Sequence, residues 1–280
     1  QSQEGLARRR IAERAVHWYK LVLGGLDGLA KARVEKRIAL GVPAGARSGS
    51  GSGTAASPVA AGAILLLTFD KGSFFEKHGK TYTKDLSGNG NDGEVRGPRP
   101  VKGKADDALS FDGVDDYVDC GKVSSLSSAV AFTICSWVAA SSLKGGAVGY
   151  VVSKDDWQEG TRGFVVRFGE GGVPMLTVGT SGWRTAKGAR LSKGAWYHLA
   201  AVCGPDALKL FVDGKEVSSE SMVGMVVPSA SNLRIGGCAF DPGRRFHGLI
   251  DEVAIFDRAL GEAEVKAIFE RGRKGQSLKS

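Results

Sequence analysis

The sequence has few cysteines, and none of them forms a C-x-x-C pair. The four thiols, at Cys120, Cys135, Cys203 and Cys238, are separated by 15, 68 and 35 residues, which fits no common zinc pattern. Each lies in or beside an expected strand, so we expect small, buried cysteines. One or two disulfides remain the alternative if the chain is exported.

Long apolar runs are also missing. No stretch approaches the roughly 20 residues that a membrane-spanning helix needs, so we expect no transmembrane segment. No signal peptide is visible, and the chain begins at Gln1 without Met, so we expect a fragment or a processed form. There is no N-x-S/T glycosylation sequon.

The net positive charge is small outside the first part of the chain. The net charge is +8, but residues 1–63 contain ten Lys/Arg and four Asp/Glu, whereas the remainder contains 28 and 26. The larger part has no basic stripe with interleaved aromatics, the pattern typical of nucleic-acid binding. We therefore expect no nucleic-acid partner.

Glycine, by contrast, is abundant, with 41 residues among 280, about twice the average usage of roughly 7%. Residues 1–41 show apolar positions every three or four residues on either side of Gly24-Gly25, which predicts a short helical hairpin. Residues 42–62 are small and rich in Gly, Ser and Ala, as in a flexible linker. Residues 63–280 then form the main domain.

Strand-like runs fill this domain. Alternation and turn residues predict about a dozen strands with no βαβ alternation, hence an all-β sandwich or barrel. The expected strands are 63–69, 107–111, 116–120, 130–138, 147–153, 163–168, 174–179, 196–203, 207–213, 215–219, 232–237 and 247–256. Asp213-Gly214 predicts a type I′ hairpin, Asp112-Gly113 suggests a second one, and residues 262–271 predict a single closing helix.

The stretch DLSGNGNDGEV, residues 85–95, has the oxygen-rich spacing of a calcium loop. With Asp85 as the first ligand of an EF-hand, the twelfth position should be a bidentate glutamate, but it is Arg96. A guanidinium cannot bind a cation, and no helical patterns flank the loop. The sequence therefore argues against an EF-hand and leaves another metal site or a polar turn.

Six segments in order carry a family resemblance: DLSGNGNDGEV, LSFDGVDDYVDC, AFTICSWV, GAWYHLAAVCGPDALKLFVDGKEV, LRIGGCAF and FHGLIDEVAIFDRALGEAEVKAIFERG. Residues 63–273 resemble the laminin-G-like jelly rolls of the concanavalin A-like lectin/glucanase superfamily. The resemblance implies an all-β jelly-roll sandwich, usually one module of a larger secreted or surface protein. The preceding hairpin resembles helical segments found before such modules in bacterial surface proteins.

The resemblance also implies calcium at the edge where the first and last strands meet. Asp70 ends the first expected strand, and Asp251 lies in the last one. We hypothesise a structural Ca²⁺ held by these two carboxylates and by the region of Asn91. The alternative is that Asp251 accepts backbone hydrogen bonds and that residues 85–95 are a plain turn.

Catalytic patterns are missing. Adjacent residues of a strand point to opposite faces, so Asp251 and Glu252 should not share a substrate. The glucanase branch of the resembled superfamily carries E-x-D-x-x-E on one strand, and this sequence has no such motif. G-x-S-x-G is absent too, and His198 is expected to be structural, with a hydrogen-bonded ring. We do not expect an enzyme.

Two tryptophans in expected loops are the candidate ligand contacts. Trp157 and Trp183 could stack on a sugar ring, while Asp155, Arg162 and Arg184 could bind hydroxyl groups. The alternative for both tryptophans is packing within their loops. We expect a binding module for a glycan or surface polymer, at an extracellular or cell-surface location. The alternative is a structural or protein–protein interaction module with no glycan ligand.

Overall fold

The structure is a computed structural model that describes residues 58–129, 131–142, 149–158, 161–222, 226–227 and 229–279. Within these ranges, only the backbone is described for Pro58, Ser128, Trp157, Gln158, Thr161 and Arg162. The expected helical hairpin of residues 1–41 and the linker up to residue 57 lie outside the described residues.

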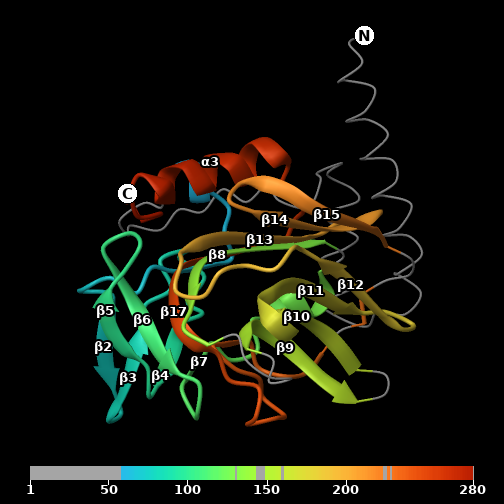
Figure 1. Ribbon diagram of the computed structural model, residues 1–280. Coiled ribbons are helices and arrows are strands. Elements are labelled where there is room, and N and C mark those ends of the chain that lie inside the picture. Colours follow the sequence, from blue (N-terminus) through green and yellow to red (C-terminus); the bar gives the residue numbers. More distant parts are fainter. Residues whose placement is uncertain are drawn as a thin grey trace, which may run out of the picture. The chain divides into compact units, whose positions relative to one another are not determined.

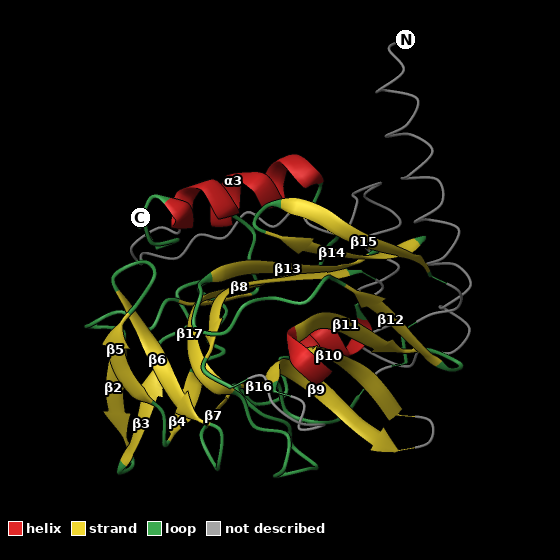
Figure 2. Cartoon of the chain, viewed as in Figure 1, coloured by secondary structure: helices red, strands yellow, loops and turns green. Residues whose placement is uncertain are grey.

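Two antiparallel sheets stack face to face, and α3 (Glu262–Arg273), the one α-helix of the described ranges, lies across one of them (Figures 1 and 2). The strands are β1 (Leu65–Leu67), β2 (Phe74–Lys77), β3 (Lys80–Thr83), β4 (Gly93–Arg96), β5 (Arg99–Lys102), β6 (Asp107–Asp112), β7 (Tyr117–Asp119), β8 (Phe132–Ala140), β9 (Tyr150–Gln158), β10 (Thr161–Gly169), β11 (Val173–Gly179), β12 (Trp183–Lys187), β13 (Tyr197–Cys203), β14 (Ala207–Val212), β15 (Lys215–Ser221), β16 (Arg234–Ile235) and β17 (His247–Phe256). Short 3₁₀ turns are η2 (Pro58–Ala60), η3 (Ser124–Ser128) and η4 (Glu170–Gly172).

Strands distant in sequence lie side by side in both sheets, as in a jelly roll. The eight-stranded sheet runs β15-β14-β13-β8-β17-β6-β5, and β1 pairs with β17. The nine-stranded sheet runs β12-β11-β10-β9-β16-β7-β4-β3-β2. The expected all-β sandwich with one closing helix is confirmed for the described residues.

The main core fills the space between the sheets because one side of each strand is apolar. In β7, Val118 is buried in this core, while Tyr117 and Asp119 on either side of it are half-buried on the outer face. Strand β8 is buried along its whole length, because the other face of the eight-stranded sheet is also covered.

Helix α3 covers that second face and closes a second apolar cluster. Val265 and Ile268 of α3 pack there with Phe211 and Phe256 of the sheet. Gly272 lets the helix approach closely, since a Cβ atom at this position would lie 2.1 Å from Nε1 of Trp137.

His198 lies in the interior strand β13, beneath α3, and its ring contacts those of Trp137 and Phe269, which also stack on each other. It is buried, and neither ring nitrogen has a hydrogen-bond partner. The expected structural position is confirmed, but the expected hydrogen-bonded ring is wrong, because neither ring nitrogen has a hydrogen-bond partner.

Most of the predicted strands are present, as is the final helix. Asp213 and Gly214 both have positive φ, at 49° and 73°, so the type I′ hairpin between β14 and β15 is confirmed. The suggested hairpin at Asp112-Gly113 is wrong, because β6 and β7 belong to different sheets. All four cysteines are free and buried, as expected from their strand positions. None of the described helices is both long and apolar enough to cross a membrane.

Candidate functional site

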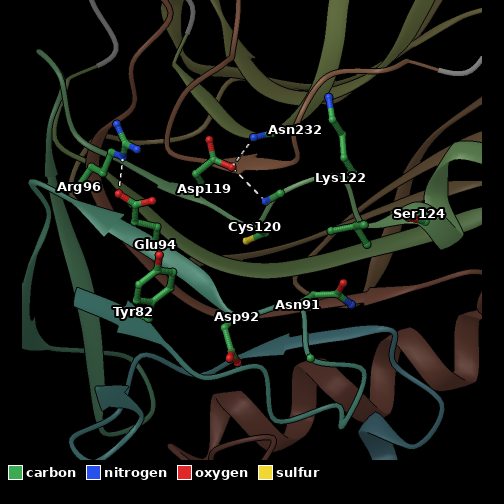
Figure 3. A pocket seen from close by; sticks show the side chains of 13 residues that line it. Tyr82, Asn91, Asp92, Glu94, Arg96, Asp119, Cys120, Lys122, Ser124 and Asn232 are labelled. Atoms are coloured by element: carbon green, nitrogen blue, oxygen red, sulfur yellow. Dashed lines mark hydrogen bonds and ion pairs between the residues drawn. The ribbon is translucent and has the colours of Figure 1, made fainter. Parts of the chain in front are cut away.

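An open cleft lies over strands β3, β4 and β7 of the nine-stranded sheet (Figure 3). Its cavity measures about 530 Å³. Polar side chains dominate the lining, together with one tyrosine ring. The lining residues are Tyr82, Gly90, Asn91, Asp92, Glu94, Arg96, Asp119, Cys120, Gly121, Lys122, Val123, Ser124 and Asn232.

Strand register creates a polar row beneath this cleft. Tyr82 of β3 pairs with Glu94 of β4, Glu94 pairs with Asp119 of β7, and Asp119 pairs with Arg234 of β16. Directly paired residues project from the same face of a sheet, so these four side chains form one row on the outer surface. The core residue Val118 fixes the direction of this row, because it holds the opposite face of β7 inward.

Ion pairs and hydrogen bonds hold the acidic members of the row. Glu94 Oε1 lies 2.9 Å from Arg96 Nε and 3.1 Å from Lys80 Nζ. Asp119 accepts hydrogen bonds from Asn232 Nδ2 at 2.9 Å and from Arg234 Nε at 3.2 Å. The cleft therefore has fixed polar walls before any ligand arrives, which lowers the entropy cost of binding.

A buried lysine supports one wall of the cleft from inside the sandwich. Lys154 Nζ donates hydrogen bonds to the carbonyl oxygens of Lys122 at 2.8 Å and Ser231 at 2.7 Å. Burial lowers the pKa of Lys154 to about 8. The ammonium thus ties the segment around Lys122 to the segment that carries Asn232.

Cationic side chains gather beside the cleft around Tyr117. The guanidinium carbons of Arg234, Arg245 and Arg96 lie 4.3, 5.1 and 5.6 Å from the centroid of its ring. Cation–π attraction holds them over this ring, so one rim of the cleft is positively charged.

The ligand contacts proposed from the sequence lie elsewhere. The side chains of Trp157 and Arg162 are outside the described part of the structure. Trp183 and Arg184 begin β12, the strand at the far edge of the nine-stranded sheet from β3. As neighbours in a strand, they point to opposite faces.

The expectation that both tryptophans lie in loops is wrong, because Trp157 is in β9 and Trp183 is in β12. Asp155, which was expected to face a ligand, is also in β9 and is buried.

The two carboxylates predicted as metal ligands lie at one edge of the sandwich, where both contact the turn between β5 and β6. Asp70 follows β1, which pairs with β17, and β17 contains Asp251. The turn between β5 and β6 lies between them: Asp251 Oδ2 accepts hydrogen bonds from the N–H groups of Lys104 and Ala105, each at 2.9 Å, and Asp70 Oδ1 accepts one from Asp107 at 3.2 Å.

A β-bulge brings a third buried carboxylate to this edge. The register of β17 against β8 shifts between Asp251 and Ala254, and Glu252 has a φ of 52°. A bulge interrupts the alternation of side chains along a strand. The alternation that would place Asp251 and Glu252 on opposite faces is therefore interrupted here, and both residues are buried.

Among the described residues, the three carboxylates whose oxygens lie within 4.8 Å of one another are Asp112, Asp115 and Asp116, and Asp70, Asp251 and Glu252 do not form such a group. Asp251 Oδ1 and Glu252 Oε1 are buried and lack hydrogen-bond partners. Burial raises the pKa of Asp251 to about 7, and the charge of Asp70 acts in the same direction. Burial raises the pKa of Glu252 well above its usual range.

Asn91 lies away from these carboxylates. Its side-chain amide donates a hydrogen bond to the carbonyl of Ile64 at 2.9 Å, and Ile64 precedes β1, whereas Asp70 follows it. The structure thus does not bring the third predicted ligand to the other two. Asn91 instead lines the cleft of Figure 3.

The cleft itself was missed in the sequence, because β2–β5 are mostly exposed and lack apolar alternation. The one available signal was the Gly79 turn between Phe74-Phe75 and Tyr82, which is typical of a hairpin that presents aromatic side chains.

Comparisons with known proteins agree with this architecture. A laminin-G-like family profile, described as the concanavalin A-like lectin/glucanases superfamily, matches residues 112–266. The chain belongs to this superfamily. No curated protein sequence matches the chain.

Solved structures with this fold include two bacterial domains. The binding domain of Paraclostridial Mosquitocidal Protein 1 has a TM-score of 0.59 and 19% identity, with 75% of this chain and 52% of that chain covered. Domain 4 of AbnA, a GH43 extracellular arabinanase from Geobacillus stearothermophilus solved with arabinotriose, has a TM-score of 0.57 and 22% identity, with 74% and 97% covered.

A sialidase of Trypanosoma rangeli, solved with sialic acid, is also similar, with a TM-score of 0.58, 15% identity, and 77% of this chain and 34% of that chain covered. This chain thus spans about half of the mosquitocidal domain and about a third of the sialidase.

Proposed function

We propose that this chain is a non-catalytic carbohydrate-binding module of an extracellular or cell-surface protein, with the cleft over β3, β4 and β7 as its sugar site. The observation that carries the proposal is the lining of that cleft. Tyr82 contributes an aromatic ring, and the carboxylate, amide and guanidinium groups of Asp92, Asn232 and Arg96 line the same cleft. Sugars present apolar faces and many hydroxyl groups, and such a lining complements both.

The structural relatives support this proposal by analogy. Domain 4 of the arabinanase was solved with arabinotriose, and its enzyme is described as extracellular. A shared fold does not transfer a ligand, so the choice of cleft rests on its own residues.

A non-catalytic role agrees with the positions of the acidic residues. Asp251 and Glu252 are buried at the sandwich edge, with 0% and 1% exposure, and cannot reach a polymer in solvent. Glu94 and Asp119 in the cleft are held by ion pairs with Arg96 and Arg234. Burial acts to raise the pKa of Glu94, but the hydrogen bonds from Arg96 and Lys80 outweigh it and lower that pKa, which disfavours Glu94 as a proton donor.

We further propose a structural Ca²⁺ at the edge site, with Asp70 and Asp251 as its carboxylate ligands. When bound, the ion would neutralise these buried carboxylates and join β1, β17 and the β5–β6 turn. The expected result is a higher melting temperature in millimolar CaCl₂ that chelator reverses. An unchanged melting temperature would contradict the calcium site.

The test of function is a glycan and polysaccharide array probed with the full chain, in calcium and then in chelator. We expect selective binding to a glycan and no turnover of it. Binding that survives chelator would support the sugar site and make the ion dispensable for it. A blank array in both buffers would contradict the proposal and favour a protein-interaction module.

A further inference from the structure

Two arginines are held together at one end of the polar row. Nη1 of Arg234 and Nη1 of Arg245 both donate hydrogen bonds to the carbonyl oxygen of Cys238, at 2.9 and 3.2 Å. Gly237 makes room for the second of them, because a Cβ atom there would lie 2.6 Å from Arg245 Nη1. The fold therefore places two like charges at a single carbonyl group.

Arg96 adds a third positive charge from β4. It pairs with Tyr117 in the register of β4 and β7, so both side chains project from the same face of the sheet. Its guanidinium carbon lies 5.6 Å from the centroid of the Tyr117 ring, and those of the other two arginines lie at 4.3 and 5.1 Å. These three side chains around Tyr117 are called the arginine cluster below. Because Arg96 also lines the cleft, the cluster is continuous with the sugar site.

Carboxylates balance only part of this charge. Glu94 Oε1 is shared between two cations, since Arg96 Nε and Lys80 Nζ lie 2.9 and 3.1 Å from it. Asp119 Oδ2 pairs with Arg234 Nε at 3.2 Å. These two carboxylates therefore face three cations before Arg245 is counted.

Arg245 has no carboxylate partner among the described residues. Asp241, the acidic residue of the same loop, pairs instead with Arg244, whose Nε lies 2.9 Å from Asp241 Oδ2. The Arg245 guanidinium donates to the Cys238 carbonyl, and its Nε is buried without an acceptor. Like charges held this close repel one another, and an added anion would offset that repulsion.

We propose that the arginine cluster binds the acidic group of the ligand, so that the chain recognises a glycan that bears carboxylate or sulfate groups. Guanidinium groups bind oxyanions through paired, charge-assisted hydrogen bonds. Since Arg96 belongs to both the cluster and the cleft, a sugar ring in the cleft places its substituents beside the cluster. The inference rests on the sugar site proposed above and names the class of glycan that this site takes.

Binding of the full chain to two pairs of polymers, included on the glycan array, tests the need for an acid. Polygalacturonate is compared with its carboxyl-reduced form, and dextran sulfate with dextran, so each acidic polymer has a neutral partner with the same backbone. We expect an acidic polymer to bind more tightly than its neutral partner, and the pair that shows the difference identifies the acid. This comparison uses the wild type alone and needs no variant to fold.

The variants Arg245→Gln and Arg190→Gln separate the cluster from the general positive charge of the chain. Arg190 is exposed in the loop after β12, the edge strand of the same sheet, and its substitution removes an equal charge. We expect Arg245→Gln to weaken the Kd for the bound acidic polymer at least about tenfold, as for lost hydrogen bonds to a charged group, and Arg190→Gln to leave it unchanged.

The contrary outcomes separate this inference from the sugar site itself. Equal affinity for acidic and neutral partners, or an equal loss in both variants, would overturn the role of the cluster. Selective array hits that are all neutral would also overturn it and leave the sugar site standing. A blank array would overturn both.

Discussion

His198 shows how a single buried residue can set a pH limit on this fold. Burial lowers its pKa to about 3, and its ring nitrogens have no hydrogen-bond partner. The unfolded-state pKa is about 6.5. Between these values the unfolded chain binds the extra proton, so stability falls as pH decreases from about 6.5 toward 3 and is unaffected above that window.

We predict that His198→Leu removes this part of the acid sensitivity. The free energy of unfolding of the variant relative to the wild type should rise as pH falls below about 6.5, since each unit of pKa shift corresponds to about 1.4 kcal/mol. Urea unfolding of both proteins at a series of pH values measures the difference. Parallel curves for the two proteins would show that His198 is not the titrating group.

Replacing Gly272 with alanine should destabilise the fold, although alanine is usually preferred to glycine inside a helix. Gly→Ala inside a helix stabilises by about 1 kcal/mol on propensity alone. Here the new Cβ would meet Trp137 Nε1 at 2.1 Å, so α3 would have to move away from the sheet. We predict a loss of about 1–3 kcal/mol, typical of overpacking.

Thermal unfolding of Gly272→Ala checks this. The control is Gly182→Ala, where the added Cβ would meet nothing within 4 Å. Equal melting temperatures for the wild type and Gly272→Ala would contradict the close approach of α3.

At the scale of elements, the loop of residues 85–92 completes the outer edge of β1. Leu86 N–H donates to the Leu66 carbonyl at 2.9 Å, and Leu66 N–H donates to Asp85 Oδ1 at 3.0 Å. The same carboxylate accepts hydrogen bonds from the N–H groups of Ser87 and Asn91. The loop thus replaces a neighbouring strand and protects a sheet edge that would otherwise be open.

We predict that Asp85→Ala destabilises the fold by about 2–4 kcal/mol, because it leaves the buried Leu66 N–H without an acceptor and removes charge-assisted hydrogen bonds. The change in melting temperature with CaCl₂ should stay as in the wild type, since Asp85 belongs to the edge of β1 and not to the site of Asp70 and Asp251. Chemical unfolding with and without calcium measures both quantities. A variant that loses its calcium response but keeps its stability would reverse this assignment.

The sequence predicted those strands whose burial produces a recognisable apolar pattern. The strands β8, β13 and β17 have apolar runs because they form the core, and Asp70 and Asp251 could be paired because β1 and β17 are the first and last strands of the sandwich. Exposed edge strands carry no such pattern: all four residues of β5 are exposed. The cleft could not be predicted for this reason, because Tyr82 and Glu94 belong to strands without apolar alternation.

The bulge in β17 could not be predicted either. Glu252 is a non-glycine residue in the left-handed region, a conformation that local sequence does not favour. Only the packing of the whole sandwich against this point and the hydrogen bond from the Leu278 N–H to Glu252 Oε2 stabilise it. The buried position of Glu252 is thus a tertiary feature, although Asp70 and Asp251 were evident in the sequence.

At the scale of the whole molecule, the two sheets differ in what covers their outer faces. Helix α3 covers the outer face of the eight-stranded sheet, whereas the outer face of the nine-stranded sheet carries an open cleft. Tyr82 in β3 and Trp183 in β12 lie near opposite edges of that sheet. One ligand-binding experiment can therefore separate the two candidate positions.

The most direct test of the account is the affinity of the wild type, Tyr82→Ala and Trp183→Ala for the oligosaccharide selected on the array, measured by titration calorimetry. Loss of an aromatic stacking surface at a binding site costs more than about 1 kcal/mol. We predict a Kd at least about tenfold weaker for Tyr82→Ala and an unchanged Kd for Trp183→Ala. Wild-type affinity in Tyr82→Ala, with binding lost in Trp183→Ala, would contradict the cleft and place the sugar at the β12 edge.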